Sequence, residues 1–131
     1  MTVDPFTYRP PTPETGPRHA AIRAAAEAAS AEIRRVLAPF WEGEHVAHYD
    51  PKPGYDAINT ACRDLHNVID EIAPAGEDKS AALRCARLAR MAANAANTPA
   101  REGEAVGLAM STRMRRADAA LTAIDEAQWW A

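Results

Sequence analysis

The chain has few of the residues that build large hydrophobic cores or disulfide scaffolds. Only 6% of its 131 residues are aromatic, and its two cysteines are Cys62 and Cys85. Two cysteines do not make a disulfide framework, which favours a reducing compartment. No apolar run approaches the ~20 residues of a membrane span, and the first residues, MTVDPFTYRPPTPE, hold no apolar signal core. We therefore expect a cytoplasmic protein with no membrane partner.

Positive charge is also scarce. The 15 Lys and Arg residues are outnumbered by 18 Asp and Glu, the formal net charge is -3, and lysine occurs only at positions 52 and 79. Proteins that bind DNA or RNA polymers normally carry an excess of basic residues, so we expect neither as a partner. The sequence also has no glycine-rich phosphate loop and no Gly-x-Ser-x-Gly elbow. We expect no enzymatic activity and no cofactor.

Alanine is the abundant residue, with 31 copies. It is the best helix former and is depleted in strands, so the composition predicts an all-α protein with closely packed helices and a thin core. The prolines divide the chain into a proline-rich arm, residues 1–16, and a helical domain, residues 17–131.

Four amphipathic helices are predicted in this domain. The first runs over about 17–38 and is stopped by Pro39, and the second begins near Tyr55 and ends before Pro74. The third runs to about Asn97 with Asp78 as its N-cap, and the fourth runs from about Glu104 to the end. Their expected inward stripes are Ile22, Ala26, Ala29, Ile33 and Val36; Ile58, Cys62, Leu65, Ile69 and Ile72; Cys85, Leu88, Met91 or Ala92, and Ala95; and Met110, Met114, Ala117, Leu121 and Ile124.

A weak internal repeat suggests how the helices pair. Tyr8 and Tyr49 each open a proline-bearing segment that is followed by a helix of about 20 residues and an Ala-Pro stop. Two helices that merely share common start and stop signals would give the same pattern. The repeat favours two antiparallel hairpins, an outer one of helices about 17–38 and 104–130 and an inner one at about 49–97.

Three stretches carry a family resemblance. They are FTYRPPTPETGPRHAAIRAAAEAAS near the start, PAGEDKS with the later ANAA in the middle, and ALTAIDEAQWWA at the end. They resemble the arm, turn and second helix of the phage cyclic-oligonucleotide sponges that counter the CBASS and Thoeris defences, which share a helical-hairpin domain. The inner copy departs from that pattern, with Arg87-Leu88 in place of the acidic pair and Ala92 in place of the tryptophan.

The resemblance implies binding without catalysis. A compact helical homo-oligomer would sequester cyclic di- or trinucleotide signals in the cytoplasm of the infected host cell. In the family, an arm tyrosine stacks on a base and a basic residue of the first helix approaches the phosphates, roles that would fall here to Tyr8 and Arg23. In the inner copy Tyr49 matches, but Asn59 stands at the position of the basic residue.

The chemistry of such a ligand selects the same residues. Flat bases require aromatic faces, and phosphates require charged donors. We therefore assign ligand binding to Tyr8, Arg9, Arg23, Tyr49 and Lys79. Structural roles are the alternatives: the two tyrosines would anchor the arm to the bundle, and Arg23 and Lys79 would lie on a solvated surface. Tyr55, at a helix start, is expected to pack. The alternative function is a small helical protein–protein interaction module of phage or bacterial origin.

The remaining unusual residues are given structural roles. We expect Trp129-Trp130 to pack on the bundle or across a subunit interface, Phe40-Trp41 to cover a bundle end, and both cysteines to lie in the core. The basic residues among 113–116 have nearby carboxylates, which favours a solvated or interface face. His45 and His48, with Glu42 and Glu44, lack the fixed spacing of a zinc site, so we expect no metal.

Overall fold

The protein is a four-helix bundle over the residues that the computed structural model describes, which are 16–41, 50–98 and 106–131. In this part of the chain the helices are α1 (Gly16–Trp41), α2 (Lys52–Ile72), α3 (Glu77–Ala96) and α4 (Val106–Trp130). The predicted all-α fold class is confirmed. None of the described helices is long and apolar enough to cross a membrane.

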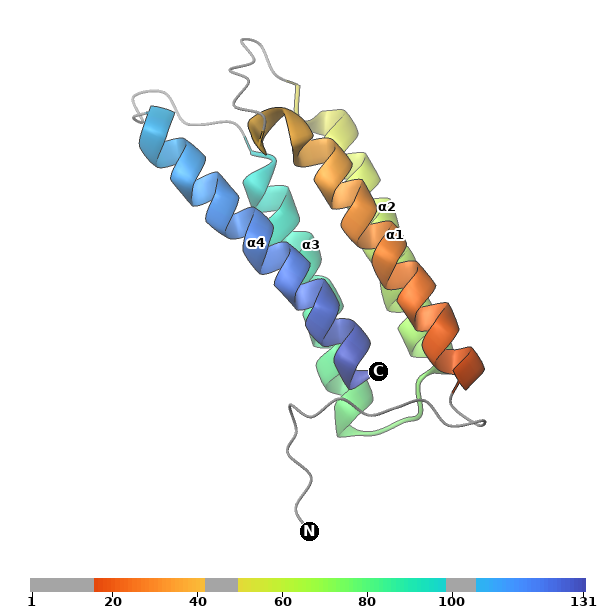
Figure 1. Cartoon of the computed structure of the whole chain (residues 1–131). Coiled ribbons are helices and arrows are strands. Elements are labelled where there is room, and N and C mark those ends of the chain that lie inside the picture. Colours follow the sequence, from red (N-terminus) through yellow and green to blue (C-terminus); the bar gives the residue numbers. More distant parts are fainter. Residues whose placement is uncertain (1–15, 42–49, 99–105) are drawn as a thin grey trace.

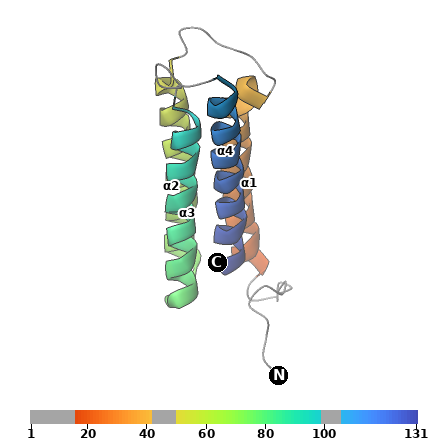
Figure 2. The same ribbon diagram turned by 90° about the vertical axis from the view of Figure 1, so that its left-hand side faces the viewer.

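Each helix runs antiparallel to the one before it, and α4 closes the ring against α1 (Figures 1 and 2). A short turn, residues 73–76, joins α2 and α3, so these two helices form one hairpin. The outer pair, α1 and α4, is also antiparallel and in contact. The most extensive helix–helix contact is between α3 and α4, and the least extensive of the four is between α1 and α4.

The core is asymmetric in side-chain size. Helices α1 and α2 supply the large side chains, whereas α3 and α4 supply almost only alanine. The large buried residues of α1 and α2 are Ile22, Ile33, Val36, Leu37, Phe40, Ile58, Leu65 and Ile69, and α4 adds Ile124; the buried alanines of α3 and α4 are Ala82, Ala86, Ala89, Ala93, Ala96, Ala117, Ala120, Ala123 and Ala127. Because a methyl group occupies little space, two alanine-lined helices can approach closely. This explains why α3 and α4 share the broadest contact.

The predicted inward stripe was right for α1 and only partly right for α3, where Cys85 is buried and Ala92 is half-buried as expected. The five expected positions of α1 are all buried, as are four of the five on α2. On α3, however, Leu88 is 49% exposed and Met91 is 61% exposed, and on α4 Met114 is 41% exposed. Ala89, next to Leu88, is fully buried instead, because only a small side chain fits between α3 and its neighbours. Met110 lies where side chains are not described.

Three helix ends also differ from the predictions. Pro39 does not stop α1, which continues to Trp41 with the proline in its last turn. The continued turn buries Phe40, which is 6% exposed. Helix α2 begins at Lys52 because Pro53 is tolerated in a first helical turn, where its missing N–H has no helical partner. The N-cap of α3 is Gly76, with φ 148°, and Asp78 lies within the first turn.

Candidate functional site

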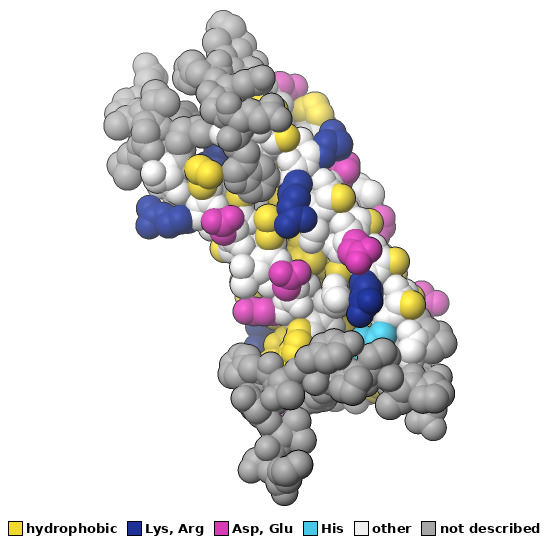
Figure 3. All heavy atoms as spheres, viewed as in Figure 1, with side chains coloured by type: hydrophobic (Ala, Val, Ile, Leu, Met, Phe, Trp, Pro, Cys, Tyr) yellow, Lys and Arg dark blue, Asp and Glu magenta, His cyan; other side chains and the backbone are white. Residues whose placement is uncertain are grey.

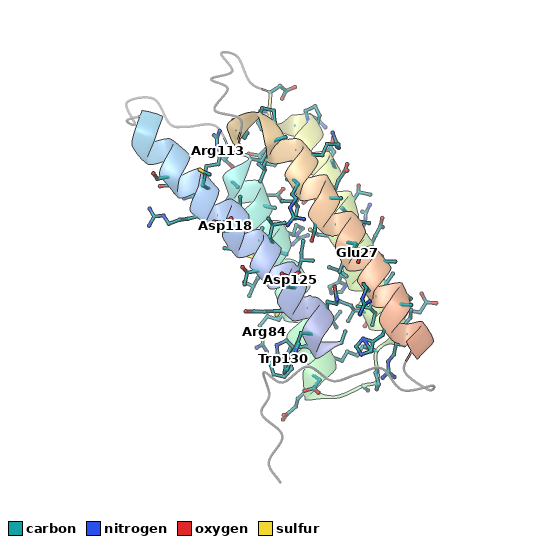
Figure 4. The ribbon with its side chains drawn as sticks, viewed as in Figure 1. Glu27, Arg84, Arg113, Asp118, Asp125 and Trp130 are labelled. Carbon is teal, nitrogen blue, oxygen red and sulfur yellow. The ribbon has the colours of Figure 1, made fainter. Side chains whose placement is uncertain are left out.

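A groove of about 250 Å³ lies between α1 and α4, the least tightly packed pair of neighbouring helices. Its apolar floor is formed by Ala26, which is buried, and Leu121, which is half-buried. The polar and remaining lining residues are Glu27, Ser30, Ala31 and Arg34 from α1, and Asp125 and Gln128 from α4. Figure 4 shows Glu27 and Asp125 on the two helices that border the groove.

The sequence folds to this arrangement because the lining residues recur at helical spacing. Glu27, Ser30 and Arg34 are three and four residues apart, which places them on one face of α1. Leu121, Asp125 and Gln128 have the same spacing on α4. Buried alanines on the inner face of each helix let both helices pack against the core, while these longer side chains stay at the rim of the groove.

The charged groups of the groove have no intramolecular partner in the described part of the chain. Neither the carboxylates of Glu27 and Asp125 nor the guanidinium of Arg34 makes an ion pair or hydrogen bond there. Elsewhere charges do pair: Arg35 Nη2 lies 2.6 Å from Glu32 Oε1, and Lys52 Nζ lies 3.0 Å from Asp56 Oδ2. The groove is open to solvent and is lined by these two carboxylates and one guanidinium.

Arg23 lies one turn from the groove on the same helix face. It is four residues before Glu27, and its side chain is exposed. Between Gly16 and Ala26 α1 holds Arg18 and Arg23 and no acidic residue, so this end combines basic side chains with the positive end of the helix dipole. Acidic and basic side chains alternate over this side of the bundle (Figure 3). The basic end of α1 is therefore the part of this side suited to phosphate.

Lys79 is held inside the α2–α3 hairpin. Its Nζ donates a hydrogen bond to the backbone carbonyl of Asp70 at 2.8 Å and lies 3.6 Å from Asp70 Oδ1. The side chain is only 22% exposed. An anion at the N-terminus of α3 would have to compete with Asp70 for this ammonium group.

The aromatic half of the predicted site lies outside the described residues. This applies to Tyr8 and Arg9 in the arm and to Tyr49 before α2. Tyr55 packs as expected, because its hydroxyl is 2.8 Å from Thr98 Oγ1 across the α2–α3 pair. The structure thus places Arg23 near the groove and Lys79 away from it, and leaves the tyrosines as sequence predictions.

The polar residues at the far end of the α2–α3 pair serve the fold. Asn94 Nδ2 donates to Asn59 Oδ1 at 2.8 Å, so Asn59 holds α3 in place of the basic residue that the resemblance would put there. Asn97 is fully buried, and its Nδ2 donates to the carbonyl of Pro51 at 2.9 Å. These contacts fix the register of α2 against α3.

The two cysteines lie in the core, as predicted. Cys62 is 2% exposed, and burial raises the pKa of its thiol to about 11. Burial also raises the pKa of Cys85, and the nearby Glu126 carboxylate adds to the shift. Both side chains therefore remain thiols at neutral pH and are poor nucleophiles. Among the described residues no cluster of His, Cys, Asp and Glu could hold a metal, and His45 and His48 lie outside them.

Sequence reasoning missed most of the groove. Ser30, Arg34, Asp125 and Gln128 were not among the candidate residues, although the polar stripe that continues from Arg23 through Glu27 was a visible signal. The pairing of α1 with α4 brings the two stripes together. Comparison of the chain with protein-family models, curated proteins and solved structures finds no match.

Proposed function

We propose that this protein binds and sequesters cyclic oligonucleotide immune signals and thereby blocks an anti-phage defence of the host, without catalysis. The observation that carries the proposal is the open groove between the two helices of the outer hairpin, with the exposed Arg23 one turn away on α1. Arg23 is the residue that the sequence resemblance assigns to phosphate contact. The resemblance and the groove therefore point to the same side of the bundle.

The requirements of a cyclic dinucleotide fit this side of the protein. Such a ligand carries two flat bases and two phosphates of about -1 charge each, and a stacked base contributes ~1–3 kcal/mol. The basic end of α1 offers guanidinium donors for phosphate oxygens, and charge-assisted hydrogen bonds are the strong ones. Tyr8, at the end of the chain that leads into α1, is our proposed stacking partner for a base.

Calorimetry with a panel of cyclic di- and trinucleotides and cyclic ADP-ribose isomers tests the proposal directly. We expect at least one member to bind with a dissociation constant below 1 μM, roughly -8 kcal/mol. We also expect the supernatant of heat-denatured protein to absorb at 260 nm when the protein is purified from cells that make the ligand. Absence of binding tighter than micromolar across the panel would contradict the proposal.

Matched variants test the site. Arg23→Ala and Tyr8→Ala should each weaken binding by roughly tenfold or more, because each removes one charge-assisted or stacking contact. Arg63→Ala is the control, since Arg63 is also exposed but belongs to α2. Circular dichroism should show unchanged helix content in all three. Equal affinities for Arg23→Ala and Arg63→Ala would remove Arg23 from the site.

A second candidate function rests on the outer face of α3. Leu88 and Met91 are 49% and 61% exposed and lie three residues apart, which places two large apolar side chains next to each other on the surface. Exposed apolar patches mark protein contacts. We propose this face as a protein contact surface. Self-association through it is compatible with nucleotide binding, whereas binding of a different protein would be the alternative function.

Light scattering and pull-down experiments distinguish nucleotide sequestration from a protein–protein interaction function. A Leu88→Gln, Met91→Gln double variant should lower the oligomer mass or lose the captured protein. Met114→Gln is the control, because Met114 is 41% exposed but belongs to α4, and it should do neither. Nucleotide binding that survives the double variant in a smaller assembly would favour an oligomeric sponge. Capture of one specific protein, with no bound nucleotide, would favour the interaction module.

A further inference from the structure

The carboxylates in the α1–α4 groove cannot contribute to phosphate binding. Glu27 and Asp125 would repel an anion, yet both line the groove without an intramolecular partner in the described chain. We propose that this groove binds the edge of a guanine base, so that the protein prefers guanine-containing cyclic dinucleotides over their adenine counterparts. This inference rests on the proposed function and names the ligand class of the same site.

The argument begins with the hydrogen-bonding edges of the bases. Guanine presents two adjacent donors, its ring N1–H and its exocyclic 2-amino group, and a carboxylate can accept both. Adenine presents one amino donor beside a ring nitrogen that is itself an acceptor, so a carboxylate facing that edge gains one hydrogen bond and meets an acceptor. Enzymes and binders that hold an extruded base read this same edge. A groove bordered by carboxylates therefore discriminates in favour of guanine.

Arg34 supplies the complementary donors. The other edge of guanine carries the acceptors O6 and N7, and arginine to this pair is the commonest specific contact to guanine. Arg34 follows Glu27 by seven residues, two helical turns and about 10 Å of rise along α1. Adenine has an amino donor in place of O6, which would face the guanidinium donors. Both ends of the groove thus favour the same base.

The size and apolar floor of the groove suit a single base. Its volume is about 250 Å³, below the ~300–1,000 Å³ of sites for larger ligands. The apolar floor of Ala26 and Leu121 matches the flat face of a purine, and Ser30 and Gln128 offer further hydrogen-bonding groups at the rim. The sugar-phosphate ring would remain outside the groove.

Basic and acidic residues of α1 would then contact different parts of the ligand. Arg23 lies four residues before Glu27, about 6 Å along the helix, and no acidic residue precedes it in α1. A phosphate next to Arg23 is thus one turn from the Glu27 carboxylate, while the base occupies the groove. Basic end and acidic groove together match a ligand that is anionic at its ring and rich in donors at its base.

The experiment compares two ligands on three proteins. Calorimetry measures cyclic di-GMP and cyclic di-AMP with the wild type, with a Glu27→Gln, Asp125→Asn variant, and with an Asp64→Asn, Glu71→Gln control. The control makes the same chemical changes at exposed positions of α2. GMP and AMP are titrated at millimolar concentration as probes of the groove alone, and thermal unfolding checks that every variant folds.

We expect the wild type and the α2 control to bind cyclic di-GMP at least about tenfold more tightly than cyclic di-AMP, since a good bidentate base contact is worth ~1–3 kcal/mol of discrimination. The groove variant should lose this preference by weakening cyclic di-GMP alone. Equal binding of both ligands by the wild type, or a preference that survives in the groove variant, overturns the inference and leaves the proposed function standing.

The monophosphates separate the two claims. If neither cyclic ligand binds but GMP binds better than AMP, and does so only with Glu27 and Asp125 intact, the groove is a guanine site and the sequestration function is wrong. If no probe shows a dependence on the groove carboxylates, the inference is overturned whether or not other cyclic nucleotides bind.

Discussion

The side chain of Asn97 fills the space next to Gly54 that a side chain at position 54 would need. A β-carbon built on Gly54 would lie 2.6 Å from Asn97 Nδ2 and 2.7 Å from Val36 Cγ1. Asn97 is fully buried, and its amide donates to the carbonyl of Pro51 at 2.9 Å. The glycine in the first turns of α2 therefore makes room for the side chain that joins this helix to the end of α3.

The first prediction is that Gly54→Ala destabilises the protein. A glycine-to-alanine change inside a helix ordinarily stabilises by ~0.5–1 kcal/mol, because glycine loses more backbone entropy on folding. At position 54 overpacking reverses this sign, and we expect a loss of about 1–3 kcal/mol in the free energy of unfolding by urea.

Gly16→Ala is the matched control for this prediction. A β-carbon on Gly16 meets nothing within 4 Å. We expect its unfolding free energy to equal or slightly exceed that of the wild type. A Gly54→Ala protein as stable as the Gly16→Ala protein would show that Asn97 and Val36 can move aside.

The second prediction concerns Asn97→Asp. The carboxylate has the same shape but cannot donate to the Pro51 carbonyl, and it is charged in a fully buried position. We expect the variant to lose about 1–3 kcal/mol of unfolding free energy at pH 7. Burial raises the pKa of a carboxyl, so stability is lost as pH rises through that pKa and returns toward pH 4, where the protonated group can donate.

Asn67→Asp controls for the added charge, since Asn67 is exposed on α2. Its unfolding free energy should stay within about 0.5 kcal/mol of the wild type at pH 7. If Asn97→Asp shows no recovery on acidification relative to this control, the hydrogen bond to Pro51 is not what holds the site.

The helices were predictable because α1 and α2 have clear amphipathic patterns. Ile33 lies between Glu32 and Arg34, and Leu65 lies between Asp64 and His66, so their burial follows from spacing alone. On α3 nearly every face carries alanine, so the inward stripe was predicted from the larger side chains Leu88 and Met91. What buries an alanine and exposes a leucine is the limited space beside α4, a property of the packed bundle that one helix's sequence does not contain.

The candidate site was predictable only where a single helix defines it. Arg23 follows from the first helix alone, and the structure leaves it exposed beside the groove. Arg34 and Asp125 line the same groove only when α1 pairs with α4, although 90 residues lie between them in the sequence. The pattern of each helix showed a polar stripe, but the meeting of two stripes is a consequence of tertiary packing.

The third prediction is that Arg113→Lys loosens the junction of α1, α3 and α4. The guanidinium carbon of Arg113, which is labelled in Figure 4, lies 3.6 Å from the centroid of the Phe40 ring, and its Nη2 donates to the carbonyl of Thr98 at 2.8 Å. A lysine keeps the charge but not the flat surface that stacks on the ring. We expect a loss of about 1–2 kcal/mol of unfolding free energy.

Arg115→Lys is the control for Arg113→Lys, because Arg115 is exposed on the same helix. It should leave the urea midpoint unchanged. Removal of the ring by Phe40→Leu should make the Arg113→Lys change less costly in a double-mutant cycle, because only the altered hydrogen bond to Thr98 then remains. Additive losses from the two changes would mean that the ring and the guanidinium do not stabilise one another.

The last prediction uses the buried thiol of Cys62. Burial raises its pKa to about 11, so the folded protein keeps the proton at a pH where the unfolded chain has released it. The stability that this thiol contributes is complete below the ordinary cysteine pKa and is lost as pH rises toward 11. Over this window the wild type should lose roughly 2–3 kcal/mol more than Cys62→Ala, whose cavity cost does not depend on pH. Urea unfolding under reducing conditions between pH 8 and pH 11 measures the difference, and parallel curves for the two proteins would contradict a buried, protonated Cys62.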